Sequence, residues 1–237
     1  MTQPPFYVSP EQVMKDRADF ARAGIARGRS VVVLGHEEGV LFVADNPSSR
    51  SLNKVSEIYD RIGFAAVGKY NEFENLRVAG IRYADLRGYS YDRTDVTARA
   101  LANAYAQTLG TVFTQDQKPY EVEIVVAEVG ATAETDRILR LTYDGSVADE
   151  FGFVAIGGDS ERLNAMLREG WRTGMGLREA YDLAVQVLSV RGEGDDAPVS
   201  RIPAENLEVA VLDRTRHRRC FRRVSGASIT GSSPSTG

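Results

Sequence analysis

Histidine and cysteine, which often carry catalysis or bind metals, are sparse in this sequence. His36 and His217 are the only histidines, and Cys220 is the only cysteine. The two histidines fall in separate hairpin contexts, too few and too far apart for zinc ligation or an assured catalytic triad. One cysteine excludes an intrachain disulfide and fits a reducing compartment. The sequence therefore predicts no metal site and no triad.

Two further patterns could bind anions, but each has a simpler structural explanation. Gly157-Gly158-Asp159-Ser160 is not a complete phosphate-binding motif and is better explained as a strand end followed by a helix cap. The arginines of residues 216–223 form a basic run in a chain whose net charge is −4. This run favours a charge-protected edge strand over nucleic-acid binding. We expect no cofactor and no nucleic-acid partner.

Composition indicates a soluble globular protein. Hydrophobic residues make up 43% of the 237 residues and charged residues 26%, which is ordinary for a folded domain. No apolar run approaches the roughly 20 residues that a membrane helix requires. The first residues also lack the apolar core of a signal peptide. We therefore expect a cytoplasmic protein without membrane contacts.

After a first helix at the N-terminus, hydrophobic periodicity divides the chain into strands, two helices, strands, two helices and final strands. Strands are predicted at residues 30–34, 40–43, 54–60, 62–68, 121–129, 137–143, 151–157, 207–212 and 218–224. Helical stripes predict helices at residues 10–26, 71–88, 94–114 and about 177–190, and a further helix that follows the cap at residues 157–160 and contains Leu163, Met166, Leu167 and Trp171. Ser9 is expected to cap the first of these helices, and Thr94 the third.

Neighbouring strands are joined by turn signals such as Asp144-Gly145, and strands and helices do not alternate as in a parallel sheet. Two antiparallel sheets packed on each other, each covered by a helix pair, would bury both faces of each sheet. This arrangement explains the uninterrupted apolar run Val31–Leu34. We predict an α+β fold, a four-layer αββα sandwich.

An ordered set of short motifs carries a family resemblance. The segment SPEQVMKDRADFARAGIARGRS is followed by a GVLFVAD strand and then by Lys54 in SLNKVSEIYDRIGF. This order is similar to the α-type subunits of the bacterial 20S proteasome, and the likeness covers roughly residues 7–224. The resemblance implies the N-terminal-nucleophile hydrolase fold, which has αββα layers. The Tyr-Asp-Arg element that is common before the Ser-Pro in that family is missing here.

Enzymes of that fold use the first residue of the first strand as nucleophile, because its free amine activates the hydroxyl. The matching position here is Ser30, behind 29 residues that include the predicted helix 10–26. The Gly-Thr junction of self-processing subunits is replaced by Gly28-Arg29-Ser30, and Asn46-Pro47 stands where a lysine is expected after the second strand. We expect no catalytic residue; a self-processing hydrolase acting through Ser30 is the alternative.

The resemblance also implies a binding pocket. In α-type subunits, the lysine that corresponds to Lys54 receives the C-terminal carboxylate of an activator, in a pocket between neighbouring subunits. A lysine suits that role as a point charge. Gly28, Gly68 and Lys69 match other walls of the pocket.

The N-terminal residues of α-type subunits converge on the ring axis and block the pore. By resemblance, the corresponding gate residues here are Phe6, Tyr7, Val8, Ser9 and Pro10. From composition alone, the proline-bearing segment would be a frayed terminus. The resemblance favours a gate.

Together these expectations predict a non-catalytic α subunit that forms a heptameric ring, stacks on β subunits, gates the passage of unfolded proteins and docks an ATPase or other activator ring. Residues 1–8 would form the gate segment, residues 9–224 a single domain, and residues 225–237 a disordered Gly/Ser-rich tail. A free-standing αββα interaction protein is a further alternative.

Overall fold

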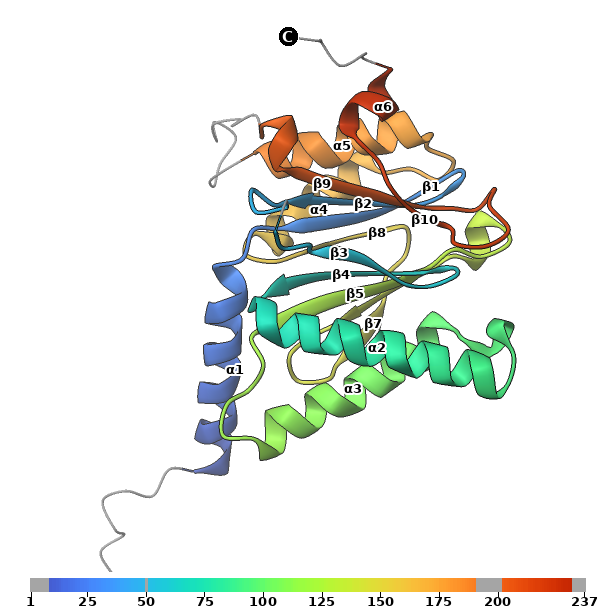
Figure 1. Cartoon of the computed structure of the whole chain (residues 1–237). Coiled ribbons are helices and arrows are strands. Elements are labelled where there is room, and N and C mark those ends of the chain that lie inside the picture. The colour runs from blue at the N-terminus through green and yellow to red at the C-terminus, as the bar shows by residue number, and fades with distance from the viewer. Residues whose placement is uncertain (1–8, 50, 191–201, 232–237) are drawn as a thin grey trace, which may run out of the picture.

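The computed structural model describes residues 9–49, 51–190 and 202–231. Within these ranges the strands form two five-stranded antiparallel sheets (Figure 1). The first sheet has the order β10 (Phe221–Arg223), β9 (Leu207–Asp213), β2 (Gly39–Asp45), β1 (Val31–His36) and β8 (Phe153–Ile156). The second has the order β3 (Val55–Tyr59), β4 (Ile62–Gly68), β5 (Val122–Glu128), β6 (Arg137–Leu141) and β7 (Val147–Asp149).

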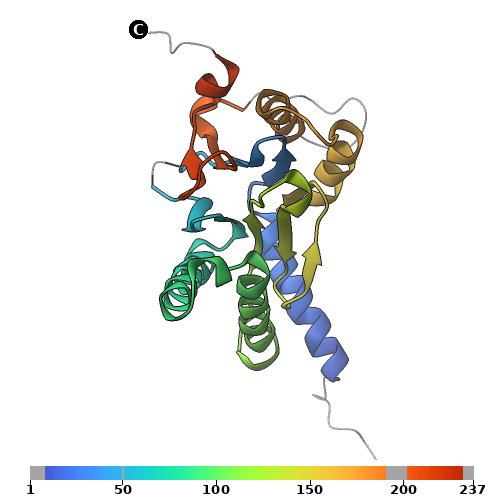
Figure 2. The same cartoon turned by 90° about the vertical axis from the view of Figure 1, so that its right-hand side faces the viewer.

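Helices cover the outer face of each sheet, as Figures 1 and 2 show. The helices are α1 (Pro10–Ala26), α2 (Tyr70–Ser90), α3 (Ala98–Gln115), α4 (Ser160–Gly170), α5 (Leu177–Ser189) and α6 (Gly226–Thr230). The described residues also form the 3₁₀ turns η1 (Arg93–Asp95), η2 (Ala133–Thr135) and η3 (Ala204–Asn206). The pair α2 and α3 packs on the sheet that contains β5, and the pair α4 and α5 packs on the sheet that contains β1. The predicted four-layer αββα sandwich is confirmed.

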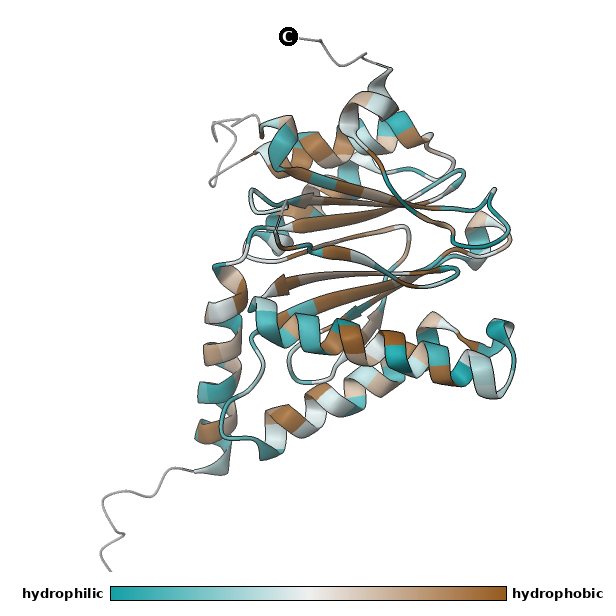
Figure 3. Cartoon of the chain, viewed as in Figure 1, coloured by the Kyte–Doolittle hydropathy of each residue, from teal (hydrophilic) through white to brown (hydrophobic). Residues whose placement is uncertain are grey.

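Strand β1 shows why the sequence lacks a clean alternation of apolar and polar residues. Val31 and Val33 pack between the two sheets, whereas Val32 and Leu34 pack under α4 and α5. Both faces of the strand are therefore buried, and every position needs an apolar side chain. The central strands appear as continuous apolar bands in Figure 3.

Helix α1 crosses one end of the sandwich (Figure 1). Its start matches the sequence signal, because the Ser9 hydroxyl accepts a hydrogen bond from the Gln12 N–H at 3.2 Å. Ala21 and Ile25 are buried against Tyr143. Arg17 donates to the main-chain oxygen of Phe113 at 2.7 Å, which ties the helix to α3.

Helix α3 begins later than the sequence analysis predicted. Thr94 does not cap it; the Thr94 N–H instead donates to the Asp92 carboxylate at 2.9 Å, which caps η1. The Thr97 hydroxyl accepts from the Ala100 N–H at 3.2 Å and caps α3. Aspartate and threonine both favour the N-cap position. Residue type alone therefore could not show whether Thr94 or Thr97 caps α3. The three-residue strand β7 was not predicted, because so short a segment shows no periodicity.

The prediction of a disordered tail is wrong for residues 226–230, which form α6. The Ser225 hydroxyl caps this helix by accepting from the Ser228 N–H at 3.1 Å. Ile229 packs against the core beneath α5, and Arg178 donates to the Thr230 main-chain oxygen at 3.0 Å. One apolar side chain produces no periodicity in the sequence, so this packing could not be foreseen. Residues 232–237 lie outside the described part.

Candidate functional site

The site lies where α1 ends against both sheets. The Gly28 N–H donates to the Ile25 main-chain oxygen at 2.8 Å and turns the chain toward β1. A Cβ atom at Gly28 would overlap the Val67 side chain and lie 3.3 Å from the Gly68 nitrogen. Gly68 itself has a φ of +116°, a conformation that favours glycine. The two glycines therefore form one tight contact between α1 and β4.

Lys54 lies beside this contact. Its Nζ donates to the Arg29 main-chain oxygen at 2.6 Å and to the Asp45 main-chain oxygen at 3.3 Å. Burial lowers the pKa of Lys54 to about 8, although the negative charges of Asp45 and Glu208 oppose the shift. The structure thus places the ammonium at the junction between the N-terminal extension and the first strand.

Glu208 on β9 fixes the position of Lys54, and the sequence analysis missed it. Its side chain is only 5% exposed. Its carboxylate accepts hydrogen bonds from the main-chain N–H groups of Lys54 at 2.8 Å and Val55 at 3.2 Å, and from the Asn46 amide at 2.8 Å. The guanidinium of Arg223, on the edge strand β10, also forms an ion pair with the Glu208 carboxylate at 2.7 Å. The one available signal was a carboxylate within the apolar strand Leu207–Asp213.

Arg29 and Asp45 form the second support of the site. The Arg29 guanidinium donates to both oxygens of the Asp45 carboxylate, at 3.1 and 2.8 Å. Asp45 is buried at the end of β2, and its main-chain oxygen accepts from Lys54. The ion pair holds the end of β2 against Arg29, in the segment between α1 and β1. An acidic residue directly after the apolar run of β2 was the signal that could have indicated it.

Lys69 belongs to a neighbouring charged cluster. It follows Gly68, but its Nζ lies 4.0 Å from the carboxylates of both Glu72 and Glu121. Lys118 binds the same two carboxylates more closely, at 2.6 and 2.9 Å. Lys54 therefore contacts Arg29, the residue after Gly28, and Gly28 lies against Gly68. The Lys69 ammonium is instead directed toward this acidic pair.

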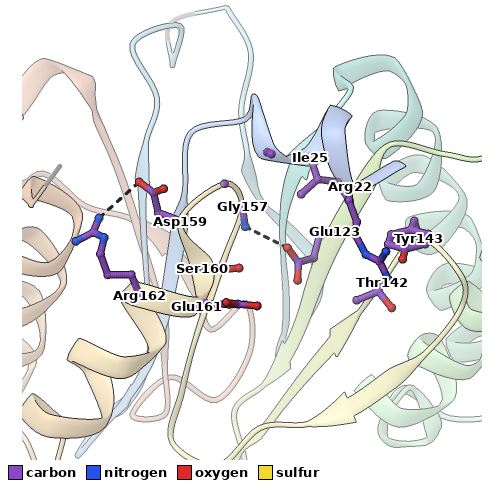
Figure 4. Close-up of a pocket in the computed structure, with 12 residues that line it drawn as sticks. Arg22, Ile25, Glu123, Thr142, Tyr143, Gly157, Asp159, Ser160, Glu161 and Arg162 are labelled. Atoms are coloured by element: carbon purple, nitrogen blue, oxygen red, sulfur yellow. Dashed lines mark hydrogen bonds and ion pairs between the residues drawn. The ribbon is translucent and has the colours of Figure 1, made fainter. Parts of the chain in front are cut away.

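Two cavities flank the end of α1. One, of about 300 Å³, is lined in part by Gly28, Arg29, Ser30 and Asp45. The other, of about 520 Å³, lies between α1, β5 and the start of α4 (Figure 4). In the larger cavity, the Glu123 carboxylate accepts from the Gly157 N–H at 3.1 Å, and burial raises the pKa of Glu123. Both cavities lie on the α1 side of the sandwich.

The arrangement at Ser30 does not favour a nucleophile. Its amino nitrogen is in a peptide bond with Arg29, whose carbonyl oxygen is bound by Lys54. The hydroxyl therefore lacks the free amine that activates it in this fold. In the described ranges, no group of three or more His, Cys, Asp or Glu side chains could hold a metal ion.

The structure places only part of the predicted gate. Ser9 caps α1 and Pro10 is its first residue. Phe6, Tyr7 and Val8 lie outside the described residues. The gate itself therefore stays a prediction.

The αββα sandwich places the protein in the N-terminal-nucleophile fold class. At its nucleophile position, Ser30, the amino group is in a peptide bond with the helical extension. Residues 25–211 match the family described as Proteasome subunit. The chain belongs to this proteasome subunit family.

Relatives named Proteasome subunit alpha are similar over nearly the whole of this chain. The protein from Kineococcus radiotolerans is 65% identical over 98% of this chain and 99% of its own. The protein from Xylanimonas cellulosilytica is 68% identical over 95% and 94%, respectively. The protein from Streptomyces coelicolor is 62% identical over 95% of this chain and 88% of its own.

Among the described residues, the helices are each too short or too polar to span a membrane.

Proposed function

We propose that the chain is the α subunit of a 20S proteasome core, a non-catalytic subunit that forms the outer ring. The observation that carries this function is 65% identity to a proteasome subunit alpha over 98% of the chain. The helix ahead of Ser30 supports it, because an attached extension prevents activation of that hydroxyl. Peptide cleavage would then belong to β subunits. Neither the Ser30 hydrolase nor a free-standing interaction protein is favoured.

Ring formation with six further copies is supported by α1. The helix exposes Val13 and Met14 near its start and Phe20 just past its middle. Exposed apolar residues gathered on one helix typically mark a protein interface. We assign this face to contacts between neighbouring α subunits.

The gate is proposed for residues 1–8, with Ser9 and Pro10 as its anchor. Ser9 and Pro10 begin a helix that is fixed to α3 through Arg17. A segment attached to so firm a helix would enter the pore at a defined place. In this proposal, unfolded proteins pass the gate on their way to the β subunits. Residues 9–224 form the single domain that carries the gate.

Activator docking is proposed at Lys54, Gly28, Gly68 and Lys69. A C-terminal carboxylate of an ATPase or other activator ring would bind the Lys54 ammonium, beside the tight turn that Gly28 and Gly68 form. Within the described residues, the Lys54 ammonium donates to two main-chain oxygens, and its third N–H is the group that we propose to bind a carboxylate. We place the assembly in the cytoplasm, in keeping with the single, buried cysteine Cys220.

Native mass spectrometry of the purified chain, alone and co-expressed with a β subunit, tests this function. Full-length chains in a ring of about seven times 26.0 kDa, or in larger particles with β, are expected. A chain shortened to begin at Ser30 would support the hydrolase instead. An intact chain that stays monomeric in both preparations would contradict the ring.

A further inference from the structure

The edges of the two sheets are tied together beside Lys54. Strand β10 is an edge strand of the first sheet, and β3 is an edge strand of the second. The Arg223 guanidinium, on β10, donates to the Val55 main-chain oxygen at 2.6 Å. It also donates to the Glu208 carboxylate at 2.7 Å. Val55 is the first residue of β3 and follows Lys54 directly. A side chain of β10 therefore binds the strand that begins just after Lys54.

Glu208 lies between Arg223 and Lys54. Its Oε1 atom accepts from Arg223 and from the Val55 N–H. Its Oε2 atom accepts from the Lys54 N–H and from the Asn46 amide. A carboxylate accepts about four hydrogen bonds, so the acceptor capacity of this buried side chain is filled. The main chain at Lys54 is therefore held in one place against β9.

Each carboxylate that acts on the Lys54 ammonium has its own arginine. Burial is the main cause that lowers the pKa of Lys54. The charges of Asp45 and Glu208 oppose that shift, and the charge of Arg29 adds to it. Arg29 pairs with Asp45, and Arg223 pairs with Glu208. Two charged residues at the start of α4, which line the recess beside Arg29, pair with each other at 3.5 Å, namely Asp159 and Arg162. Loss of either member of the Glu208–Arg223 pair would therefore change the charge beside Lys54 in a known direction.

The position of Arg223 depends on the segment that follows it. The Val224 N–H donates to the Val209 main-chain oxygen at 3.0 Å, which continues the pairing of β10 with β9. The Ser225 hydroxyl then caps α6, and α6 packs against α5 (Figure 1). Residues 221–231 thus form one anchored segment that places the Arg223 guanidinium at the edges of both sheets.

We propose that Glu208 and Arg223 are positioning residues for activator docking, and that residues 221–231 control the Lys54 ammonium through them. This inference rests on the docking function proposed for Lys54. Glu208 holds the main chain of Lys54 and adds negative charge beside its ammonium. Arg223 holds Glu208 and offsets that charge. A displacement of β10 would therefore change both the placement of Lys54 and its hold on the proton, without any contact between β10 and the activator.

The titration of Lys54 tests the proposal without an activator. The full-length protein is acetylated with traces of acetic anhydride between about pH 6 and pH 10, a range that includes the Lys54 pKa of about 8. Acetic anhydride reacts with the neutral amine, so mass spectrometry of the peptide that contains Lys54 gives the pKa of its ammonium. Glu208→Gln removes a negative charge and should lower this pKa by at least about half a pH unit. Arg223→Gln leaves the Glu208 charge without its arginine and should raise the pKa by at least about half a pH unit.

Two further variants separate the charge effect from damage to the fold. Arg222→Gln removes the neighbouring arginine of β10, whose side chain is 44% exposed like that of Arg223 but pairs with Asp213. This control should keep the Lys54 pKa of the parent. Arg223→Lys retains the positive charge and should restore the parent value. A general loosening would instead raise the pKa in the Glu208 and Arg223 variants alike, because burial is the main cause that lowers it.

Protection of Lys54 from acetylation connects this titration to docking. The probe is acetyl-trialanine with a free C-terminal carboxylate, and the same peptide with a C-terminal amide is the control. At pH 7 the free acid should slow the acetylation of Lys54 in assembled rings of the parent, and the amide should not. Arg223→Gln should need at least about threefold more of the free acid for the same protection, because Lys54 is less firmly placed and the unbalanced Glu208 charge repels a carboxylate.

Two results would overturn the proposal. One is the parent pKa of Lys54 in both the Glu208→Gln and the Arg223→Gln protein. The other is a shift of the same sign in both, or an equal shift in Arg222→Gln, because either would indicate a general loosening. Expected titrations without protection of the parent by the free acid would instead contradict docking at Lys54, the function on which the inference rests. Because Arg223 is exposed, its variants test the proposal even if the Glu208 variant does not fold.

Discussion

The Nζ atom of Lys54 lies 2.6 Å from the main-chain oxygen of Arg29, the last residue before Ser30. This contact joins the lysine to the point where the helical extension meets the sheet. The same ammonium also reaches the Asp45 main-chain oxygen at 3.3 Å. Lys54 is thus positioned by the fold before any partner arrives, which reduces the entropy that a bound carboxylate would have to offset.

Replacing Lys54 by alanine should weaken activator-dependent protein degradation by roughly tenfold or more. The lost contact is a charge-assisted hydrogen bond, which contributes about 1.5–3 kcal/mol. Cleavage of small peptides by the assembled particle should be unchanged, because it does not require a docked activator. The measurement compares degradation of an unfolded protein with peptide turnover. Lys118→Ala, which removes an ammonium from the neighbouring acidic cluster, is the control. Equal activator binding by the Lys54 variant and its parent would exclude the proposed role.

Activator affinity should depend on pH in a defined direction. The pKa of Lys54 is lowered to about 8, so the ammonium loses its proton as pH rises through that value. Attraction for a carboxylate requires the protonated form, and affinity should therefore fall between about pH 7 and pH 9. Surface plasmon resonance over this range measures the effect. Lys54→Arg keeps its charge, and its affinity should stay level. A parallel decline in both proteins would assign the effect to another group.

Deletion of residues 2–8 should raise peptide hydrolysis by the assembled particle several-fold. The deleted segment precedes the Ser9 cap, so α1 and its contact with α3 should stay intact. Peptide turnover is compared between the deleted and full-length particles at equal concentration, with ring assembly confirmed by native mass spectrometry. Unchanged turnover in intact rings would argue against a gate in these residues.

The sequence predicted the fold better than the site because the two depend on different signals. Helix α1 could be delimited from Ser9, Pro10 and its buried stripe, since capping and periodicity are local. The supports of Lys54 are remote. Its ammonium binds a main-chain oxygen 25 residues away, and its N–H binds the Glu208 carboxylate 154 residues away. Main-chain oxygens are present at every residue, so such contacts have no signature in the sequence. Lys54 itself was identified only through the family resemblance.

Gly28→Ala should destabilise the protein by about 1–3 kcal/mol, the usual cost of overpacking. The added methyl group would overlap the Val67 side chain at the contact of α1 with β4. Chemical denaturation measures the change. Gly110→Ala is the matched control, because the position lies within α3 and a Cβ atom there would make only an ordinary contact of 3.6 Å, with the Asp144 main-chain oxygen. That variant should be as stable as the parent or up to about 1 kcal/mol more stable, since alanine favours a helix more than glycine does. Equal stabilities of the two variants would contradict the tight contact.

His36 should make the stability of the domain decrease in mild acid. Its ordinary pKa is 6.5, and burial together with the positive charge of Arg214 lowers the folded value to about 4, against the opposing charges of Asp136 and Asp213. The unfolded chain takes up the proton first as pH falls. Stability is therefore complete above pH 6.5, declines between 6.5 and 4, and has lost about 3 kcal/mol below that window.

Variants of the two histidines separate this effect from the titration of carboxylates. His36→Leu removes the titrating ring, so its free energy of unfolding should change less between pH 6.5 and 4 than that of the parent. His217→Leu removes the exposed histidine and should keep the slope of the parent. Urea denaturation at several pH values measures all three proteins. If the His36 variant loses stability as steeply as the parent, the imidazole is not the group responsible.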